Sequence, residues 1–111
     1  MDSEEELLNR LQDSLSKSKY KVMRKGRDQG YDILLEGPDG KKVVIEIKNK
    51  VTPIDSVDVA QVYSAKQKIK ADQALLVSPA VSTTSASESG KRTGVRILKP
   101  NEVADYLGYT E

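Results

Sequence analysis

The chain has 111 residues, of which 32% are charged, but its formal net charge is only +1. This length predicts a single domain over residues 1–111 with a modest core, and the balanced charge gives no reason to expect a general polyanion-binding role. Cysteine and histidine do not occur, which excludes disulfides, thiol nucleophiles, Ser-His-Asp triads and the usual Cys/His zinc sites.

The N-terminal part of the chain predicts a helix, a strand and a loop. Residues 3–16 form the helix, with Ser3 as a candidate N-cap and acidic residues in the first turn, where the helix dipole favours them. Its apolar stripe recurs at helical spacing and consists of Leu7, Leu8, Leu11 and Leu15. Residues 20–23 favour a strand, and a loop follows between Gly26 and Gly30.

Two further strands, residues 31–36 and 42–48, are joined by a turn-like segment of glycine, proline and aspartate. Successive side chains of a strand point to opposite faces, so Glu46 and Lys48 share one face of the second strand. A strand that only filled a core would not carry a glutamate and a lysine on the same face. This hairpin is therefore a candidate functional element.

The register of this hairpin follows from its apolar residues. Apolar residues oppose apolar residues when Ile33 pairs with Ile45, Leu34 with Val44, and Leu35 with Val43. The same register sets Asp32 opposite Glu46. The Cβ atoms of directly opposed residues lie about 4.5–5.5 Å apart, so two carboxylates at these positions can share one metal ion.

The C-terminal half predicts alternating helices and strands. The expected elements are a helix over 56–70 that begins at Asp55 or Ser56, a strand over 73–78, a segment over 82–90 that is either a short helix or a loop, a strand over 94–98, and a helix capped by Asn101 that ends near 107–108. This order predicts an α/β fold, an α/β/α sandwich with a mixed central sheet of about five strands.

Two acids and a lysine at the end of a strand are typical of a divalent-metal site that hydrolyses phosphodiester bonds. Without Cys or His, the ligands are oxygens, which favours Mg²⁺, Mn²⁺ or Ca²⁺. A metal held by Asp32 and Glu46 would polarise the phosphate and lower the pKa of a bound water, and Lys48 would orient the water and stabilise the developing charge. The alternative is a surface hairpin with ordinary ion pairs, each worth about 0–1 kcal/mol.

The run from Asp28 to Asp32, followed by the run from Val44 to Lys48, resembles the PD-(D/E)xK nuclease superfamily, which has a restriction-endonuclease-like fold. The D-x-G-x-D stretch is similar to the Mrr-like branch, and archaeal Holliday junction resolvases share much of the same plan. The likeness extends from the opening helix to the closing strand and helix. Tyr31 stands where the superfamily has the proline of its name.

The resemblance implies a role for each charged residue of the hairpin. Asp32 and Glu46 would bind Mg²⁺ or Mn²⁺ together with the backbone carbonyl of Ile47, and Lys48 would be the catalytic lysine. Gln61 would be a polar residue that supports the site, with ordinary helix packing as the alternative interpretation.

These branches often add a glutamate from the first helix. Glu4 is our candidate, because it lies three and four residues before Leu7 and Leu8 and so shares their side of the helix. The alternative is that all three acids of this turn, Glu4, Glu5 and Glu6, are solvated and only favour the helix dipole.

The expected partner is DNA. Lys25 and Arg27 precede the first acid and Lys50 follows the second strand, so these three are the predicted phosphate contacts, and binding would depend steeply on salt. Candidates further from the site are Lys66, Lys68, Lys70, Lys91 and Arg92.

A cut through both strands of a duplex needs two active sites, so we expect a homodimer. Apolar residues on several sides of the helix over 56–70 suggest that some of them face the second subunit: Val59, Val62, Tyr63 and Ile69.

The sequence thus predicts a Mg²⁺- or Mn²⁺-dependent DNA endonuclease, either Mrr-like or directed to a DNA structure such as a four-way junction. The alternative is a catalytically silent module of the same fold that binds nucleic acid or a protein. No signal peptide or membrane-spanning run is visible, so we expect a cytoplasmic protein without a membrane partner.

Overall fold

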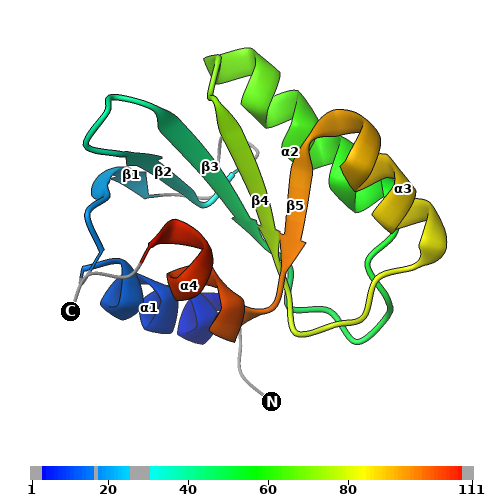
Figure 1. Cartoon of the computed structure of the whole chain (residues 1–111). Coiled ribbons are helices and arrows are strands. Elements are labelled where there is room, and N and C mark those ends of the chain that lie inside the picture. Colours follow the sequence, from blue (N-terminus) through cyan, green and yellow to red (C-terminus); the bar gives the residue numbers. More distant parts are fainter. Residues whose placement is uncertain (1–3, 17, 26–30, 109–111) are drawn as a thin grey trace.

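The computed structural model describes residues 4–16, 18–25 and 31–108, with the backbone alone for Glu4, Ser14, Arg24 and Lys25. These residues form α1 (Glu4–Leu15), β1 (Lys21–Lys25), β2 (Ile33–Glu36), β3 (Lys42–Ile47), α2 (Ser56–Ile69), β4 (Gln73–Val77), α3 (Thr84–Thr93), β5 (Val95–Leu98), the 3-10 turn η1 (Pro100–Glu102) and α4 (Val103–Leu107) (Figure 1). The predicted order of helices and strands is confirmed.

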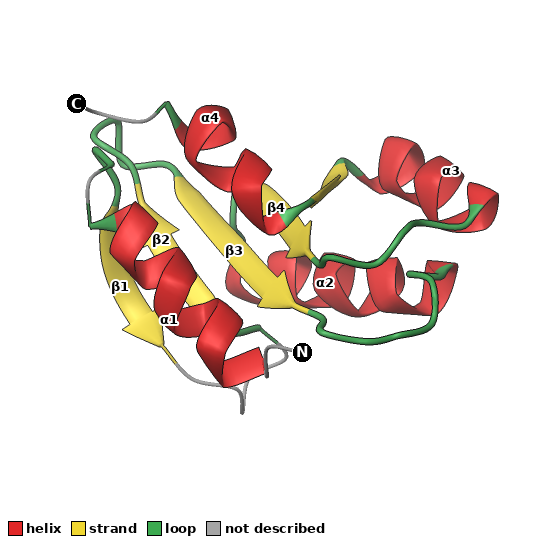
Figure 2. Ribbon diagram, turned by 90° about the horizontal axis from the view of Figure 1, so that it is seen from below, coloured by secondary structure: helices red, strands yellow, loops and turns green. Residues whose placement is uncertain are grey.

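The five strands form one mixed sheet in the order β1-β2-β3-β4-β5. β2 runs antiparallel to both of its neighbours, β1 and β3, whereas β3, β4 and β5 run parallel to one another. Because α2 and α3 connect parallel strands, the C-terminal ends of these strands and the N-termini of both helices lie at the same end of the sheet. Figures 1 and 2 show α1 and α4 on one face and α2 and α3 on the other. The predicted α/β/α sandwich is therefore confirmed.

Each face of the sheet has its own apolar core. Side chains alternate along β3, so Ile45 packs with α1 and α4 while Val44 packs with α2 and α3. The first core includes all three buried leucines of α1: Leu7, Leu11 and Leu15. The second core includes Tyr31, which is only 2% exposed. Burial on both faces fixes the position of β3 and of the charged residues at its end.

The loops that lead from β3 into α2 and from β4 into α3 are tied to each other. The Ile54 N–H donates to the Val81 carbonyl at 2.8 Å, and the Thr83 N–H donates to the Ile54 carbonyl at 2.9 Å. Of the two candidates at the start of α2, Asp55 is the N-cap and Ser56 is the first helical residue, and Thr83 caps α3. These bonds hold the two loops, and with them the two helix N-termini, side by side (Figure 2).

Three sequence-based expectations change. The segment over 82–90, for which helix and loop were both open, is helical from Thr84 onward, where α3 begins. Asn101 does not cap the last helix: η1 precedes α4, and the Lys99 N–H donates to the Glu102 carboxylate at 2.6 Å. The apolar residues of α2 that were expected to face a second subunit contact the chain's own second core instead. Val59 and Val62 are buried in it, and Tyr63 and Ile69 are partly buried against it.

Within the described parts of the chain, no helix is both long and apolar enough to cross a membrane.

Candidate active site

The hairpin has the predicted register. Ile33 pairs with Ile45, and Leu35 pairs with Val43, so apolar residues oppose apolar residues. The ladder ends at the first of these pairs, and Asp32 lies one residue beyond it, next in register to Glu46. The Asp32 N–H still donates to the Ile45 carbonyl at 2.8 Å. Asp32 is therefore held beside β3 at the point where the two strands separate.

The carboxylate of Asp32 is buried and bonded to the backbone of the neighbouring strand. The residue is 3% exposed, and its Oδ2 accepts a hydrogen bond from the Ile47 N–H at 2.7 Å. The next N–H along β3, that of Lys48, donates to Val77 of β4 at 2.9 Å. Successive peptide groups of β3 thus face opposite neighbours, and the peptide N–H of Ile47 faces Asp32.

Glu46 and Lys48 lie on the α2 side of the sheet, because Ile47 between them packs into the opposite core. The Lys48 Nζ is 3.7 Å from Glu46 Oε1, and their side chains are 25% and 16% exposed. This separation makes an ion pair in which both charged groups remain accessible from solvent. Asp32, Glu46 and Lys48 are brought together at the end of the hairpin, as predicted.

A third acid, Asp58, lies close to the lysine that follows these residues and was not anticipated from the sequence. Asp58, in the first turn of α2, accepts a hydrogen bond from Lys50 Nζ at 2.7 Å. Its Oδ2 also accepts from the Asp55 N–H at 3.0 Å, and its own N–H donates to Asp55 Oδ1 at 3.0 Å, which completes a capping box. The spacing of Asp55 and Asp58 indicates such a box in the sequence, but it does not indicate the bond to Lys50.

The electrostatics of this second pair follow from its contacts. Burial by itself would raise the pKa of Asp58. The hydrogen bonds from Lys50 and from the Asp55 N–H, together with the charges of Lys50 and Lys48, outweigh burial and hold the pKa below its ordinary value of 3.8. The hydrogen bond to Asp58 raises the pKa of Lys50 above 10.5, against a smaller opposing effect of burial. Both groups are charged at neutral pH.

The other predicted site residues either are exposed or lie outside the described residues. Gln61 is exposed and lies one helical turn beyond Asp58. The side chains of Glu4 and Lys25, and the whole of Arg27, lie outside the described residues, whereas Glu5 and Glu6 are exposed. In the described part of the chain, no three acidic side chains gather as a group able to hold a metal.

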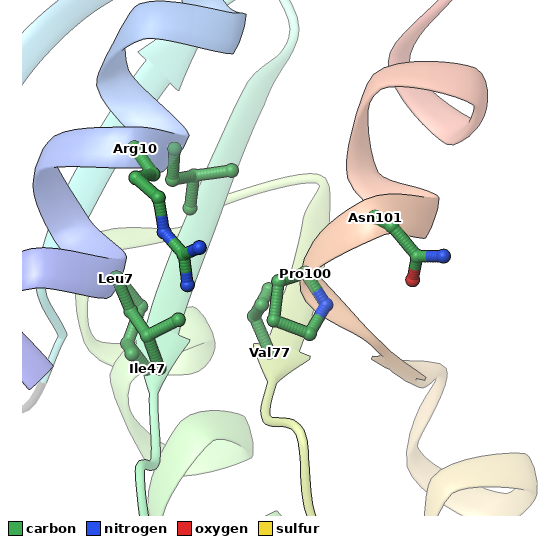
Figure 3. Close-up of a pocket in the computed structure, with 7 residues that line it drawn as sticks. Leu7, Arg10, Ile47, Val77, Pro100 and Asn101 are labelled. Atoms are coloured by element: carbon green, nitrogen blue, oxygen red, sulfur yellow. The ribbon is translucent and has the colours of Figure 1, made fainter. Parts of the chain in front are cut away.

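A pocket of about 220 Å³ lies on the other face of β3 (Figure 3). Its floor is apolar, and Arg10 and Asn101 stand at its sides; the residues that line it are Leu7, Arg10, Leu11, Ile47, Val77, Pro100 and Asn101. Ile47 points into this pocket, while Glu46 and Lys48 point away from it to the other face. The pocket is therefore separate from the charged cluster.

The comparisons with known proteins agree with this arrangement. The sequence matches the profile of the Mrr_cat family, described as restriction endonuclease, over residues 3–107. No curated protein matches the chain.

Solved structures share the fold at low sequence identity. A repair endonuclease from Pyrococcus abyssi superposes with a TM-score of 0.73 at 21% identity, over 89% of this chain and 47% of that one. EndoMS in its apo form gives a TM-score of 0.71 at 20% identity, over 89% and 46%. A complex of EndoMS with double-stranded DNA gives 0.69 at 21% identity, over 87% and 44%. The chain thus spans a little less than half the length of these proteins.

Because the profile covers nearly the whole chain, from the first helix to the last, the protein belongs to the restriction endonuclease family, a family of nucleases with this mixed-sheet fold.

Proposed function

We propose that this chain, as a single domain over residues 1–111, is a metal-dependent DNA endonuclease that hydrolyses phosphodiester bonds. The observation that carries the proposal is the meeting of Asp32, Glu46 and Lys48 at the end of one hairpin, with Asp32 bonded to the Ile47 N–H at 2.7 Å. The family match supports nuclease chemistry. DNA as the substrate is supported by two of the similar structures, a repair endonuclease and a complex of EndoMS with double-stranded DNA.

The chemistry of the donor set fits a small hard cation. Asp32 and Glu46 offer carboxylate oxygens from two neighbouring strands. The carbonyl of a residue in an extended strand points to the same side as its N–H, which directs the Ile47 carbonyl toward Asp32. Mg²⁺ keeps several waters and commonly binds through one or two carboxylates, so this set suffices without a third acid. Mg²⁺ or Mn²⁺ bound there would polarise the phosphate and lower the pKa of a water ligand.

The chain's own residues have separate tasks in this proposal. Asp32 and Glu46 would hold the cation, which would supply positive charge to the phosphate. Lys48 donates a hydrogen bond from Nζ to the phosphate oxygen on which negative charge develops, as the water oxygen bonds to phosphorus and the bond to the leaving sugar oxygen breaks. The 3.7 Å separation from Glu46 leaves the ammonium group of Lys48 able to make this contact. Gln61 supports the site from the exposed face of α2.

The partner and the assembly belong to the same proposal. Lys25, Arg27 and Lys50 would contact phosphates on either side of the cut, and Glu4 would add a further ligand from α1. The enzyme would act as a homodimer so that both strands can be cut, as an Mrr-like nuclease or one directed to a DNA structure.

The test is an assay on supercoiled plasmid, linear duplex, single-stranded DNA and a four-way junction, with Mg²⁺, with Mn²⁺ and with EDTA. We expect cleavage with either metal, none with EDTA, and none by Asp32→Ala or Lys48→Ala. The matched controls, Glu88→Gln and Lys41→Ala, change exposed residues that have no part in the proposed site and should cleave normally. Binding of DNA without cleavage under both metals would contradict the proposal and favour the catalytically silent module.

A further inference from the structure

The charges at this end of the sheet form an alternating series that extends beyond the three residues of the proposed site. Lys48 lies 3.7 Å from Glu46, and Lys50 lies 2.7 Å from Asp58. The charge of Lys48 also acts on Asp58, in addition to the direct bond from Lys50. An acid that interacts with both ammonium groups affects how each of them contacts a phosphate.

Asp58 is held more firmly than either lysine. It belongs to the rigid first turn of α2, it is 8% exposed, and two bonds of the capping box join it to Asp55. Lys50, by contrast, lies in the loop between β3 and α2, where no regular ladder fixes its side chain. The bond between them therefore ties the ammonium group of Lys50 to the first turn of α2.

The bond to Asp58 does not exhaust the donors of Lys50. An ammonium group has three N–H donors, and Asp58 accepts at one oxygen, so Lys50 keeps the capacity to donate to a phosphate. Two residues of extended chain span at most about 7 Å, so the Cα atoms of Lys48 and Lys50 lie no further apart than this and their side chains start from neighbouring positions. Lys50 thus suits a phosphate next to the one held by Lys48.

We propose that Asp58 is a positioning residue that holds Lys50 in place for a phosphate beside the scissile one. The inference rests on the proposed DNA substrate. A lysine held in advance loses less side-chain entropy on binding than a free one, so its contact contributes more to affinity. Asp58 itself touches neither the phosphate nor the reacting atoms.

The experiment is a binding cycle on a short DNA duplex in EDTA, where no cleavage interferes. Dissociation constants are measured over a range of salt for the wild type, Lys50→Gln, Asp58→Asn and the double variant. In the wild-type background, Lys50→Gln should weaken binding about tenfold and reduce the slope of log K against log salt by about 0.9, the value for one lost phosphate contact. In the Asp58→Asn background, the same change should weaken binding by about twofold or less.

Two results would overturn the inference. An equal effect of Lys50→Gln in both backgrounds would mean that the residues act independently. A larger effect in the Asp58→Asn background would mean that Asp58 competes with phosphate for Lys50 instead of positioning it. The cycle cancels the general effect of removing one negative charge, because both Asp58→Asn proteins share it.

The matched control is Asp55→Asn, which keeps a good N-cap and leaves the bond between Lys50 and Asp58 in place. Lys50→Gln should still weaken binding about tenfold in this background, and loss of that effect would assign it to the helix terminus and overturn the inference. If Asp58→Asn melts below the assay temperature, Asp58→Ser takes its place, since its hydroxyl can accept from the Asp55 N–H. This binding measurement does not depend on cleavage. A protein that shows the expected dissociation constants but cleaves no DNA would contradict only the proposed endonuclease activity. A protein that cleaves DNA but does not show them would contradict only the role of Asp58.

Discussion

Two sets of acid and lysine lie at the same end of the sheet and differ in how closely their charges are joined. In the hairpin, Lys48 is 3.7 Å from Glu46, and the neighbouring carboxylate of Asp32 comes from another strand. In the second set, Lys50 and Asp58 are in direct contact at 2.7 Å, and the same oxygen accepts a backbone N–H. The first set brings two carboxylates together, and the second gives each charge a partner of opposite sign.

This difference indicates that the first set serves catalysis and the second set serves positioning. Two neighbouring carboxylates repel each other, and a cation bound between them relieves this repulsion. In a close pair of opposite charges, each charged group already has a partner, and the hydrogen bond between them restrains the two segments that carry them. We therefore expect substitutions in the first set to affect catalysis, and those in the second to affect binding and stability.

The largest effect is expected from Asp32→Asn. Supporting partners of metal ligands typically contribute 10–100-fold to activity, so loss of a proposed ligand should reduce the cleavage rate by more than about 100-fold. DNA binding in EDTA should stay within about threefold of wild type, because Asp32 is buried and contacts no DNA. Asp105→Asn, at an exposed position in α4, is the matched control and should cleave normally. Parallel losses of binding and cleavage would indicate damage to the fold instead.

The next largest effect is expected from Lys48→Ala. Removal of one group that stabilises charge in the transition state costs about 10²–10³-fold in kcat. Single-turnover rates over a range of Mg²⁺ should show this loss with little change in the metal concentration needed for half the maximal rate. A large shift of that concentration would instead place Lys48 in metal binding.

The pair of Lys50 and Asp58 should make the free energy of unfolding depend on pH. The pKa of Asp58 is lowered in the folded protein, so its contribution to stability is complete above 3.8 and is lost as pH falls through the lower, folded value. Wild type should therefore exceed Asp58→Asn in free energy of unfolding at pH 7, and the two should converge at lower pH. Urea unfolding between pH 2 and pH 7 measures this, and a constant difference over that range would contradict the assignment.

A smaller effect is expected from Asp55→Ala, which removes the N-cap of α2. Loss of a side-chain cap destabilises a protein by about 1 kcal/mol. Thermal unfolding at pH 7 should show this decrease, whereas Asp55→Asn should change stability by less than about half as much. Equal losses in the two variants would show that the charge of Asp55, and not the cap bond, is what stabilises the helix.

The smallest effect is expected at the other end of the parallel strands. Lys66 Nζ lies near the start of β5, 3.9 Å from the position that a Cβ on Gly94 would occupy. This end is opposite to the one that holds Glu46 and Lys48. Lys66→Ala should change neither cleavage nor the salt dependence of binding, as measured in the same assays, and a slope lower by about 0.9 would extend the DNA surface to this end.

Much of this arrangement could be predicted from the sequence, because its cause is local. The pairing of Ile33 with Ile45 follows from burial of both sides of β3, and that register brings Asp32 next to Glu46. Other features depend on packing between elements distant in the chain. The contact of Lys50 with Asp58 depends on how α2 lies against the end of β3, and the apolar pattern of α2 could not tell whether Val59 faces its own core or another subunit.

The most direct test of the central claim compares the wild type with Glu46→Gln. The substitution keeps the size of the side chain and removes one of the two carboxylates proposed to hold the cation. Mn²⁺ binding is measured by calorimetry, and cleavage of supercoiled plasmid is measured in the same buffer. We predict that Glu46→Gln loses Mn²⁺ binding and plasmid cleavage together while it remains folded. Cleavage at the wild-type rate by Glu46→Gln would contradict the account.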